Sequence, residues 1–128
     1  CRQEMALNID VAPTLLDIAG ITPPDAIQGQ SLLPLLENKP VCWREEFYYE
    51  HTFEHPAIPK SEGVVEIRYK YLRYYEQSPV YEELYDRETD PLEINNLAEN
   101  PEHRELLEQL RQRCDKLRQR YQNGLMQR

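Results

Sequence analysis

Three side chains that can carry positive charge lie close together in the chain, at His51, His55 and Lys60. Imidazole and ammonium groups donate hydrogen bonds to anions, and histidine changes its charge near neutral pH. The surrounding stretch is expected to be a loop of about a dozen residues between two strands, and long loops on rigid sheets often carry function. We therefore name these three residues as candidate substrate contacts.

Two other interpretations of this loop stay open. Histidines four residues apart can share a metal ion on a helix, but Pro56 and Pro59 oppose a helix here, and no third ligand is evident. These features argue against a metal site. The loop can also be a solvated or packing segment that contacts no ligand.

The cysteines offer no obvious catalytic or metal-binding motif. Cys1, Cys42 and Cys114 are an odd number, are widely spaced and include no C-x-x-C pair, which supports neither a disulfide framework nor a zinc site. Cys114 falls on the apolar stripe of a predicted helix and is expected to be a small buried hydrophobe. The sequence assigns no role to Cys1 or Cys42.

Charged residues are dense in two further places. The acidic run from Glu82 to Asp90 lacks the glycine and closing glutamate of an EF-hand, so it is predicted to be a turn-rich, solvated segment. Four arginines of the last helix are predicted to form a solubilising face: Arg111, Arg113, Arg118 and Arg120.

These residues need a scaffold, and the middle of the chain predicts a sheet. Alternation of apolar and polar residues, with many tyrosines, predicts strands over residues 47–50, 64–68, 71–75 and 80–85. Short connections favour an antiparallel meander. Asp86 ends the last strand, and Asp90-Pro91 fixes a turn, because proline biases the residue before it away from the helical region.

A long helix is predicted from Pro101 to Asn123. Its apolar stripe consists of Leu106, Leu110, Cys114, Leu117 and Tyr121, at steps of three or four residues, and Leu107 widens it. Asn100 is expected to cap the start, and Gly124 to end the helix. At 1.5 Å per residue the helix is ~34 Å long, enough to cross four strands. The predicted fold is α+β, a four-stranded antiparallel sheet packed by this helix.

The first 40 residues have a different pattern. Residues 8–19 predict a short helix that Asn8 or Asp10 caps and Gly20 ends, and Leu32 to Leu36 predict a single turn capped by Ser31. Prolines then break the chain, so we place a subdomain boundary near residue 40. The excess of exposed leucines before it predicts that this part is loosely held or packs on another copy.

Composition excludes several classes of partner. The chain has 128 residues, a net charge of −8 and a pI near 4.9, so nucleic acid and anionic membrane surfaces are not expected partners. It contains no apolar run long enough to span a bilayer and no charged-then-apolar leader. Because it begins with Cys1 rather than Met, we expect a fragment or a processed end.

Several motifs occur in the order typical of one enzyme family. They are Asn8-Ile9-Asp10 with Ala12-Pro13-Thr14-Leu15-Leu16-Asp17, then residues 28–36 (QGQSLLPLL), then Arg68-Tyr69-Lys70-Tyr71-Leu72, and finally Leu84-Tyr85-Asp86 with Asp90-Pro91, Glu93, Asn96-Leu97 and Pro101-Glu102. Together they span almost the whole chain and resemble the C-terminal portion of the sulfatase family.

This resemblance implies an architecture and a chemistry. Residues 1–40 would be a short helix and linker from the end of a missing α/β catalytic domain of the same chain, and residues 41–128 the C-terminal subdomain. The catalytic domain would hold a formylglycine, made from cysteine or serine, beside a calcium ion. The nucleophile motif is absent here, so no cofactor and no catalytic residue is expected in this fragment. Many relatives are periplasmic or secreted.

Three functions stay open at this point. The first is a subdomain that closes the cleft of a sulfatase acting on a sulfated small molecule or sugar. The second is the same region of a phosphonate or phosphate monoester hydrolase of the same superfamily. The third is a stand-alone acidic binding module. The fragment itself is expected to be inactive, and its exposed leucines favour self-association.

Overall fold

A computed structural model describes residues 4–126, which form two units that divide between Glu45 and Glu46. We call them the N-terminal unit and the C-terminal unit and describe each by itself. The division falls a few residues after the boundary predicted near residue 40. The reason is that Trp43 donates its indole N–H to the Met5 carbonyl at 2.9 Å, which holds residues 41–45 in the N-terminal unit.

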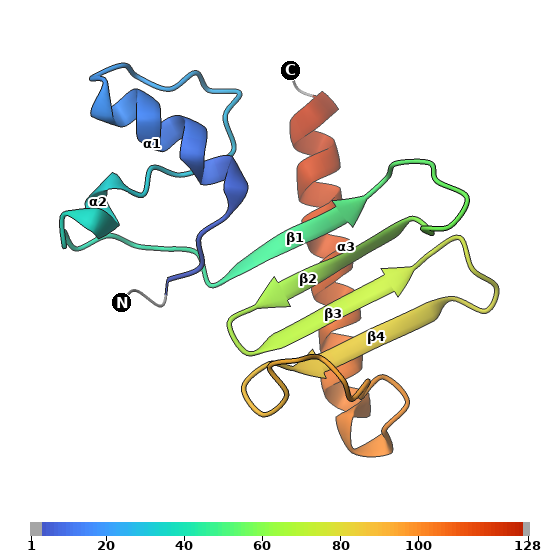
Figure 1. The fold of residues 1–128 in the computed structure, drawn as a ribbon. Coiled ribbons are helices and arrows are strands. Elements are labelled where there is room, and N and C mark those ends of the chain that lie inside the picture. The colour runs from blue at the N-terminus through green and yellow to red at the C-terminus, as the bar shows by residue number, and fades with distance from the viewer. Residues whose placement is uncertain (1–3, 127–128) are drawn as a thin grey trace. The chain divides into compact units, whose positions relative to one another are not determined.

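The N-terminal unit contains the short helices η1 (Asn8–Asp10), α1 (Val11–Ile18) and α2 (Leu33–Leu36) (Figure 1). Gly20 follows α1 with φ of 69°, a left-handed conformation that ends the helix as predicted. Gly29 lies against the backbone of η1, where an added Cβ would be 1.9 Å from the Ile9 carbonyl oxygen. Only glycine permits this close approach.

The predicted side-chain cap of α1 is wrong. Neither Asn8 nor Asp10 caps this helix through its side chain. Asp10 is instead fully buried and accepts hydrogen bonds from the backbone N–H groups of Leu7 and Gln30 at 2.8 and 2.9 Å. The carboxylate also pairs with both terminal nitrogens of Arg44, one of them at 2.6 Å. The Asp10 side chain therefore holds the N-cap backbone of η1 and residues 30 and 44, and it does not cap α1.

The C-terminal unit is a four-stranded antiparallel sheet in the order β1-β2-β3-β4, as predicted. The strands are β1 (Glu46–His51), β2 (Ser61–Glu66), β3 (Tyr69–Tyr74) and β4 (Tyr81–Asp86). In the central register Tyr48 pairs with Val64, Val64 with Tyr71, and Tyr71 with Leu84. This row of side chains therefore lies on one face of the sheet.

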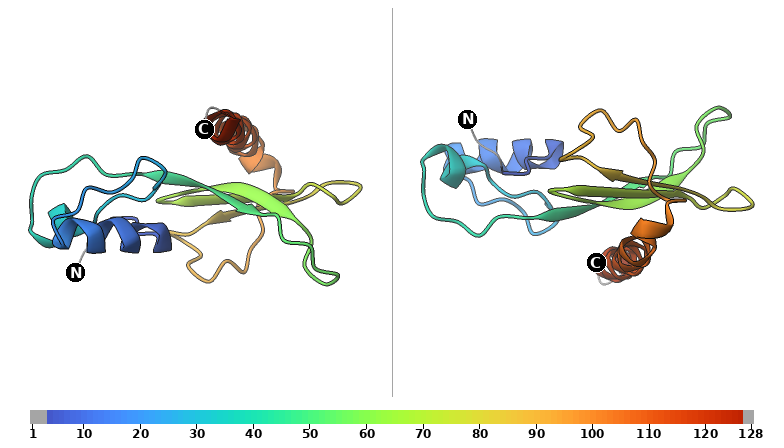
Figure 2. Two further views of the ribbon diagram at one scale, coloured as in Figure 1. Left: turned by 90° about the horizontal axis from the view of Figure 1, so that it is seen from above. Right: turned by 90° about the horizontal axis from the view of Figure 1, so that it is seen from below.

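The long helix covers that face (Figures 1 and 2). It begins as η2 (Pro101–His103) and continues as α3 (Arg104–Met126), and the Asn100 side chain accepts the Glu102 N–H at 3.0 Å, so the predicted cap is confirmed. Its side chains pack on the sheet in a core of Val64, Tyr71, Leu84, Leu107, Leu110, Cys114 and Leu117. Gly124 lies within α3, so the helix end predicted there is wrong; glycine in a helix costs only about 1 kcal/mol relative to alanine.

The loop between β4 and η2 is fastened to the sheet by one amide side chain. Asn96 accepts the Leu84 N–H at 3.0 Å and donates to the Glu82 carbonyl at 2.9 Å. Leu97 packs against the core. The loop is therefore ordered by β4 as well as by its own turns.

Candidate functional site

The predicted loop is the connection between β1 and β2. Both strands extend farther than predicted, so the loop covers residues 52–60, with His55 and Ile58 forming an isolated antiparallel bridge. His51 is the last residue of β1 and pairs with Ser61, the first residue of β2. The loop therefore rises directly from two hydrogen-bonded strands, a rigid base for a binding loop.

His51 is half-buried, and its Nε2 atom is buried without a hydrogen-bond partner among the described residues. A buried polar nitrogen without a partner costs about 1–3 kcal/mol. Native structures keep few such atoms, and the Nδ1 atom of His103 in η2 is also buried without a hydrogen-bond partner among the described residues. His51 is thus the candidate residue with a hydrogen-bonding atom still unused.

His55 and Lys60 are already engaged. The exposed His55 accepts the Ala57 N–H on Nδ1 at 3.1 Å, which fixes the turn. Lys60 forms ion pairs with Glu76 at 3.0 Å and Glu54 at 3.2 Å, and its hydrogen bonds to these carboxylates raise its pKa. Glu76 follows β3, so the β1–β2 and β3–β4 connections meet at the same end of the sheet (Figure 1). No hydrogen bond or ion pair joins any two of the three candidates within residues 4–126.

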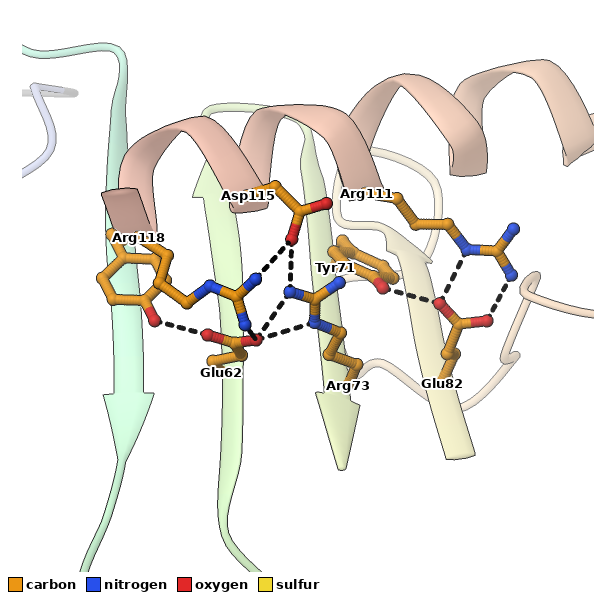
Figure 3. Close-up of polar contacts among 8 residues, drawn as sticks. Glu62, Tyr71, Arg73, Glu82, Arg111, Asp115 and Arg118 are labelled. Carbon is orange, nitrogen blue, oxygen red and sulfur yellow. Dashed lines mark hydrogen bonds and ion pairs between the residues drawn. The ribbon is translucent and has the colours of Figure 1, made fainter. Parts of the chain in front are cut away.

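A second cluster of ionisable residues lies between the sheet and α3 (Figure 3). Glu62, only 3% exposed, accepts from Tyr48 at 2.6 Å and Arg73 at 2.8 Å. Asp115 of α3 accepts from Arg73 at 2.6 Å and from Arg118 at 3.2 Å. The guanidinium groups thus bridge carboxylates of the strand and the helix.

The same arrangement recurs along the helix. Glu82 accepts from Tyr71 at 2.6 Å and from Arg111 at 2.8 Å (Figure 3). The hydrogen bonds from Arg111 lower the pKa of Glu82 despite its partial burial. Burial, followed by the neighbouring glutamate, raises the pKa values of Tyr48 and Tyr71, so both phenols stay protonated at neutral pH.

The prediction that the arginines of the last helix form only a solubilising face is therefore wrong for three of them. Arg111 and Arg118 bind the sheet, and Arg113 donates to Glu46 of β1 at 2.7 Å. The sequence held a signal that was missed. Glu62, Arg73 and Glu82 are each two positions from a core residue of the same strand, so strand periodicity points them at the same helix. Those core residues are Val64, Tyr71 and Leu84.

The cluster lines an open pocket of about 510 Å³ together with Tyr75 and Val80. Its three arginines, Arg73, Arg111 and Arg118, face three carboxylates, so its formal charge cancels. Each guanidinium already holds a carboxylate partner. This arrangement fastens the helix to the sheet and leaves no spare cation for a ligand.

Cys114 is not an activated nucleophile. Burial raises the pKa of Cys114 to about 12, so this thiol stays protonated, as the prediction of a small buried hydrophobe requires. Cys42 is exposed, and Cys1 lies outside the described residues.

Metal ligands are not gathered in the described part of the chain. No group of three or more His, Cys, Asp or Glu side chains within residues 4–126 is placed to hold a metal ion. In the acidic run, hydrogen bonds from Arg68 lower the pKa of Asp86 to about 2, and Asp90 accepts the Asn95 N–H at 2.8 Å. Asp86 and Asp90 thus build turns after β4. The turn-rich, solvated segment predicted from Glu82 to Asp90 is wrong for its first half, because Glu82 and Glu83 lie in β4 and Asp86 is buried. No helix of the described residues is long and apolar enough to cross a bilayer.

Comparison with known proteins agrees with the fold and the motifs. The family model of the N-sulphoglucosamine sulphohydrolase C-terminal region matches residues 1–120. An N-acetylglucosamine-6-O-sulfatase of Bacteroides thetaiotaomicron is 34% identical over 126 residues, which cover 94% of this chain and 22% of the relative.

Solved structures give the same result. One, in complex with its substrate D-glucosamine-2-N,6-O-disulfate, superposes with a TM-score of 0.79 at 34% identity, over 92% of this chain and 25% of the other. The phosphonate monoester hydrolase of Agrobacterium radiobacter superposes with a TM-score of 0.67 at 25% identity, over 87% of this chain and 24% of that one. This chain therefore spans about a quarter of these structures and about a fifth of the curated relative.

Proposed function

Because the chain belongs to the sulfatase family and matches its C-terminal region, we propose that it works within an enzyme that hydrolyses sulfate esters. The observation that carries this proposal is the match of the family model to residues 1–120. The sulfate-cleaving centre, with its formylglycine and calcium, belongs to the catalytic domain of the same protein. The C-terminal unit completes the substrate cleft.

The nucleophile motif is absent from the sequence, and within residues 4–126 no group of side chains fits a calcium ion. Cys114 is buried under α3 with a raised pKa, and no metal-binding group of side chains is present in the described residues. No step of the reaction is therefore assigned to this chain. Its contribution is binding and orientation of the substrate.

The substrate class that we propose is a sulfated amino sugar. A relative is named for N-acetylglucosamine-6-O-sulfate hydrolysis, and a structural neighbour holds a disulfated glucosamine. Within this chain, His51, His55 and Lys60 supply donors at one end of the sheet. Of these, His51 has the unused Nε2 atom, whereas Lys60 must exchange Glu54 or Glu76 for the substrate.

The loop assignment is tested in the full-length enzyme with alanine at each of the three positions. A lost contact to a charged group costs about 1.5–3 kcal/mol, which lowers kcat/KM by roughly ten- to 150-fold. Lys116→Ala, an exposed lysine on α3, is the matched control and should leave kcat/KM unchanged. Melting curves should show no loss of stability. If all three variants stay within about twofold of the parent, the loop does not touch substrate.

A second candidate activity rests on the likeness to the phosphonate monoester hydrolase. Sulfate and phosphonate monoesters differ in charge and in the reacting atom, so parallel assays separate them. We expect the full-length enzyme to cleave glucosamine 6-sulfate faster than a phenylphosphonate monoester. The reverse preference would identify the second activity. A reading frame without an upstream nucleophile motif would indicate a stand-alone binding module instead.

A further inference from the structure

Lys60 has two acidic partners at one end of the sheet, and the two come from different segments. Its ammonium group is 3.2 Å from the carboxylate of Glu54 and 3.0 Å from that of Glu76. Glu54 belongs to the same loop of residues 52–60, whereas Glu76 belongs to the connection between β3 and β4. The first pair therefore closes the loop on itself, and the second ties the loop to the neighbouring connection.

Glu76 is the firmer of these two partners. It lies inside a turn that begins directly after β3, where the Gln77 N–H donates to the Tyr74 carbonyl at 3.2 Å. Lys60 directly precedes β2, and β2 is hydrogen-bonded to β3. Its side chain is only 22% exposed, and the hydrogen bond to Glu76, ahead of that to Glu54, raises its pKa. The pair between Lys60 and Glu76 thus joins the ends of two adjacent strands.

Glu54 is held loosely by comparison. Its side chain is 88% exposed, and residues 52–54 belong to no helix, strand or turn. Exposed ion pairs contribute little to stability, because water screens both charges and two long side chains must be ordered. An anionic ligand can therefore replace Glu54 beside Lys60 more readily than it can replace Glu76.

We propose that Glu76 is a positioning residue for substrate binding, which keeps its ion pair with Lys60 while Glu54 gives up the same ammonium group to an anionic group of the substrate. This inference rests on the proposed function, because it names the partner that Lys60 exchanges when the substrate binds. Glu54 then competes with the substrate. Glu76 instead holds the base of the loop, and with it the ammonium group, in the position from which it binds.

The test is the KM of the full-length enzyme for glucosamine 6-sulfate, measured for Glu54→Gln and for Glu76→Gln. Both substitutions remove one negative charge beside the same ammonium group, so a general electrostatic effect on an anionic substrate would lower KM in both. We expect opposite changes instead. KM should fall by about two- to fivefold in Glu54→Gln and rise by at least about two- to fivefold in Glu76→Gln, which is the scale of one exposed ion pair.

The same experiment separates positioning from a merely structural role. The kcat should stay unchanged in both variants, because the contact is made equally in the ground state and the transition state. The Tm should also stay unchanged, whereas a structural role of Glu76 would lower it. Because the pair acts as a unit, Lys60→Ala/Glu76→Gln should raise KM no more than Lys60→Ala alone. Glu99→Gln, at an exposed position, controls for net charge. Changes of the same sign in Glu54→Gln and Glu76→Gln would overturn the inference.

Hydrogen exchange measures the anchoring of the loop without any substrate. Peptides that cover residues 52–60 of the full-length protein should exchange faster in Glu76→Gln than in the parent, and Glu54→Gln should leave them unchanged. Equal exchange in the parent and Glu76→Gln would overturn the inference whatever the activity. A parent enzyme that cleaves no sulfated amino sugar would instead refute the proposed function, and the exchange rates would then decide the anchoring by Glu76 on their own.

Discussion

At the scale of single residues, burial and partner choice decide what each charged group does. Asp10 shows this most clearly. Burial raises the pKa of its carboxyl, but the hydrogen bonds from Arg44, Gln30 and Leu7 outweigh that effect and lower it. The carboxylate therefore stays ionised inside the N-terminal unit and ties η1 to residues 30 and 44.

Asp10→Asn should destabilise the N-terminal unit by about 3–5 kcal/mol, because removing one partner of a buried ion pair leaves the other charge uncompensated. The expected readout is rapid proteolysis within residues 4–45. Glu37→Gln breaks only the exposed pair with Lys39 and should change the cleavage rate little. Similar cleavage rates for the two variants would contradict the assigned role of Asp10.

Glu66 presents the opposite shift. Burial, then the charge of Glu46 directly opposite on β1, raises its pKa above 4.5, although Arg113 partly offsets this. A raised folded-state pKa stabilises the fold below the unfolded value, and this stabilisation is lost as pH rises through the folded value. At neutral pH the ionised Glu66 therefore weakens the C-terminal unit.

Glu66→Gln should consequently increase the free energy of unfolding at pH 7 more than at pH 4, because the amide stays neutral at both. Urea titrations at the two pH values measure this difference. Glu99→Gln, at an exposed position, controls for the general change in net charge. An equal effect of Glu66→Gln at both pH values would show that its titration does not contribute.

At the scale of elements, polar side chains fasten the loop and the helix to the sheet. The apolar stripe of α3 supplies the core, and the carboxylate–arginine pairs around Glu62 and Glu82 set its position across the strands. A different position of the helix would break these pairs and leave a buried charge without its partner. The pairs therefore favour the observed position of the helix over others.

Asn96→Ala should destabilise the C-terminal unit by about 1–3 kcal/mol, because it leaves the Leu84 N–H and the Glu82 carbonyl without their partner. Asn95→Ala is the matched control, since only the backbone N–H of Asn95 is bonded, to Asp90. Hydrogen exchange at the Leu84 amide reports the loss directly. Unchanged protection of that amide would contradict the role of Asn96.

At the scale of the whole molecule, exposed apolar surface predicts association. Within the N-terminal unit, α1 exposes Val11, Leu15 and Ile18 at 53%, 62% and 61%. Burying one leucine side chain stabilises by about 1.5–3 kcal/mol, so several exposed together favour contact with another surface. The exposed apolar side chains of α1 are therefore the surface through which we expect the 128-residue chain to self-associate.

Leu15→Glu/Ile18→Glu should shift the 128-residue chain toward the monomer in sedimentation velocity. The variant Gln119→Glu/Gln122→Glu adds the same charge at exposed positions of α3 and should leave the distribution unchanged. A parent chain that is monomeric at all concentrations would refute the prediction. The parent chain should also turn over no aryl sulfate, because the nucleophile motif is absent from its sequence and the thiol of Cys114 stays protonated.

The sequence by itself determined the features that depend on neighbours along the chain. Strand alternation, the apolar stripe of α3, the Asn100 cap and the glycine at position 20 all follow from local periodicity and backbone preference. Together with the short connections between the strands, these features predict the sheet order and the helix that covers the sheet. The order of the motifs gave the family for the same reason, since it is a property of the linear chain.

Only the tertiary structure decided which polar groups meet. Arg44 is 34 positions from Asp10, and Arg118 is 56 positions from Glu62, so no local rule connects them. The lack of a hydrogen-bond partner for the Nε2 atom of His51 among the described residues likewise depends on how distant segments pack. A buried polar side chain needs a hydrogen-bond partner to compensate its desolvation. Partners from distant segments become available only when the chain has packed.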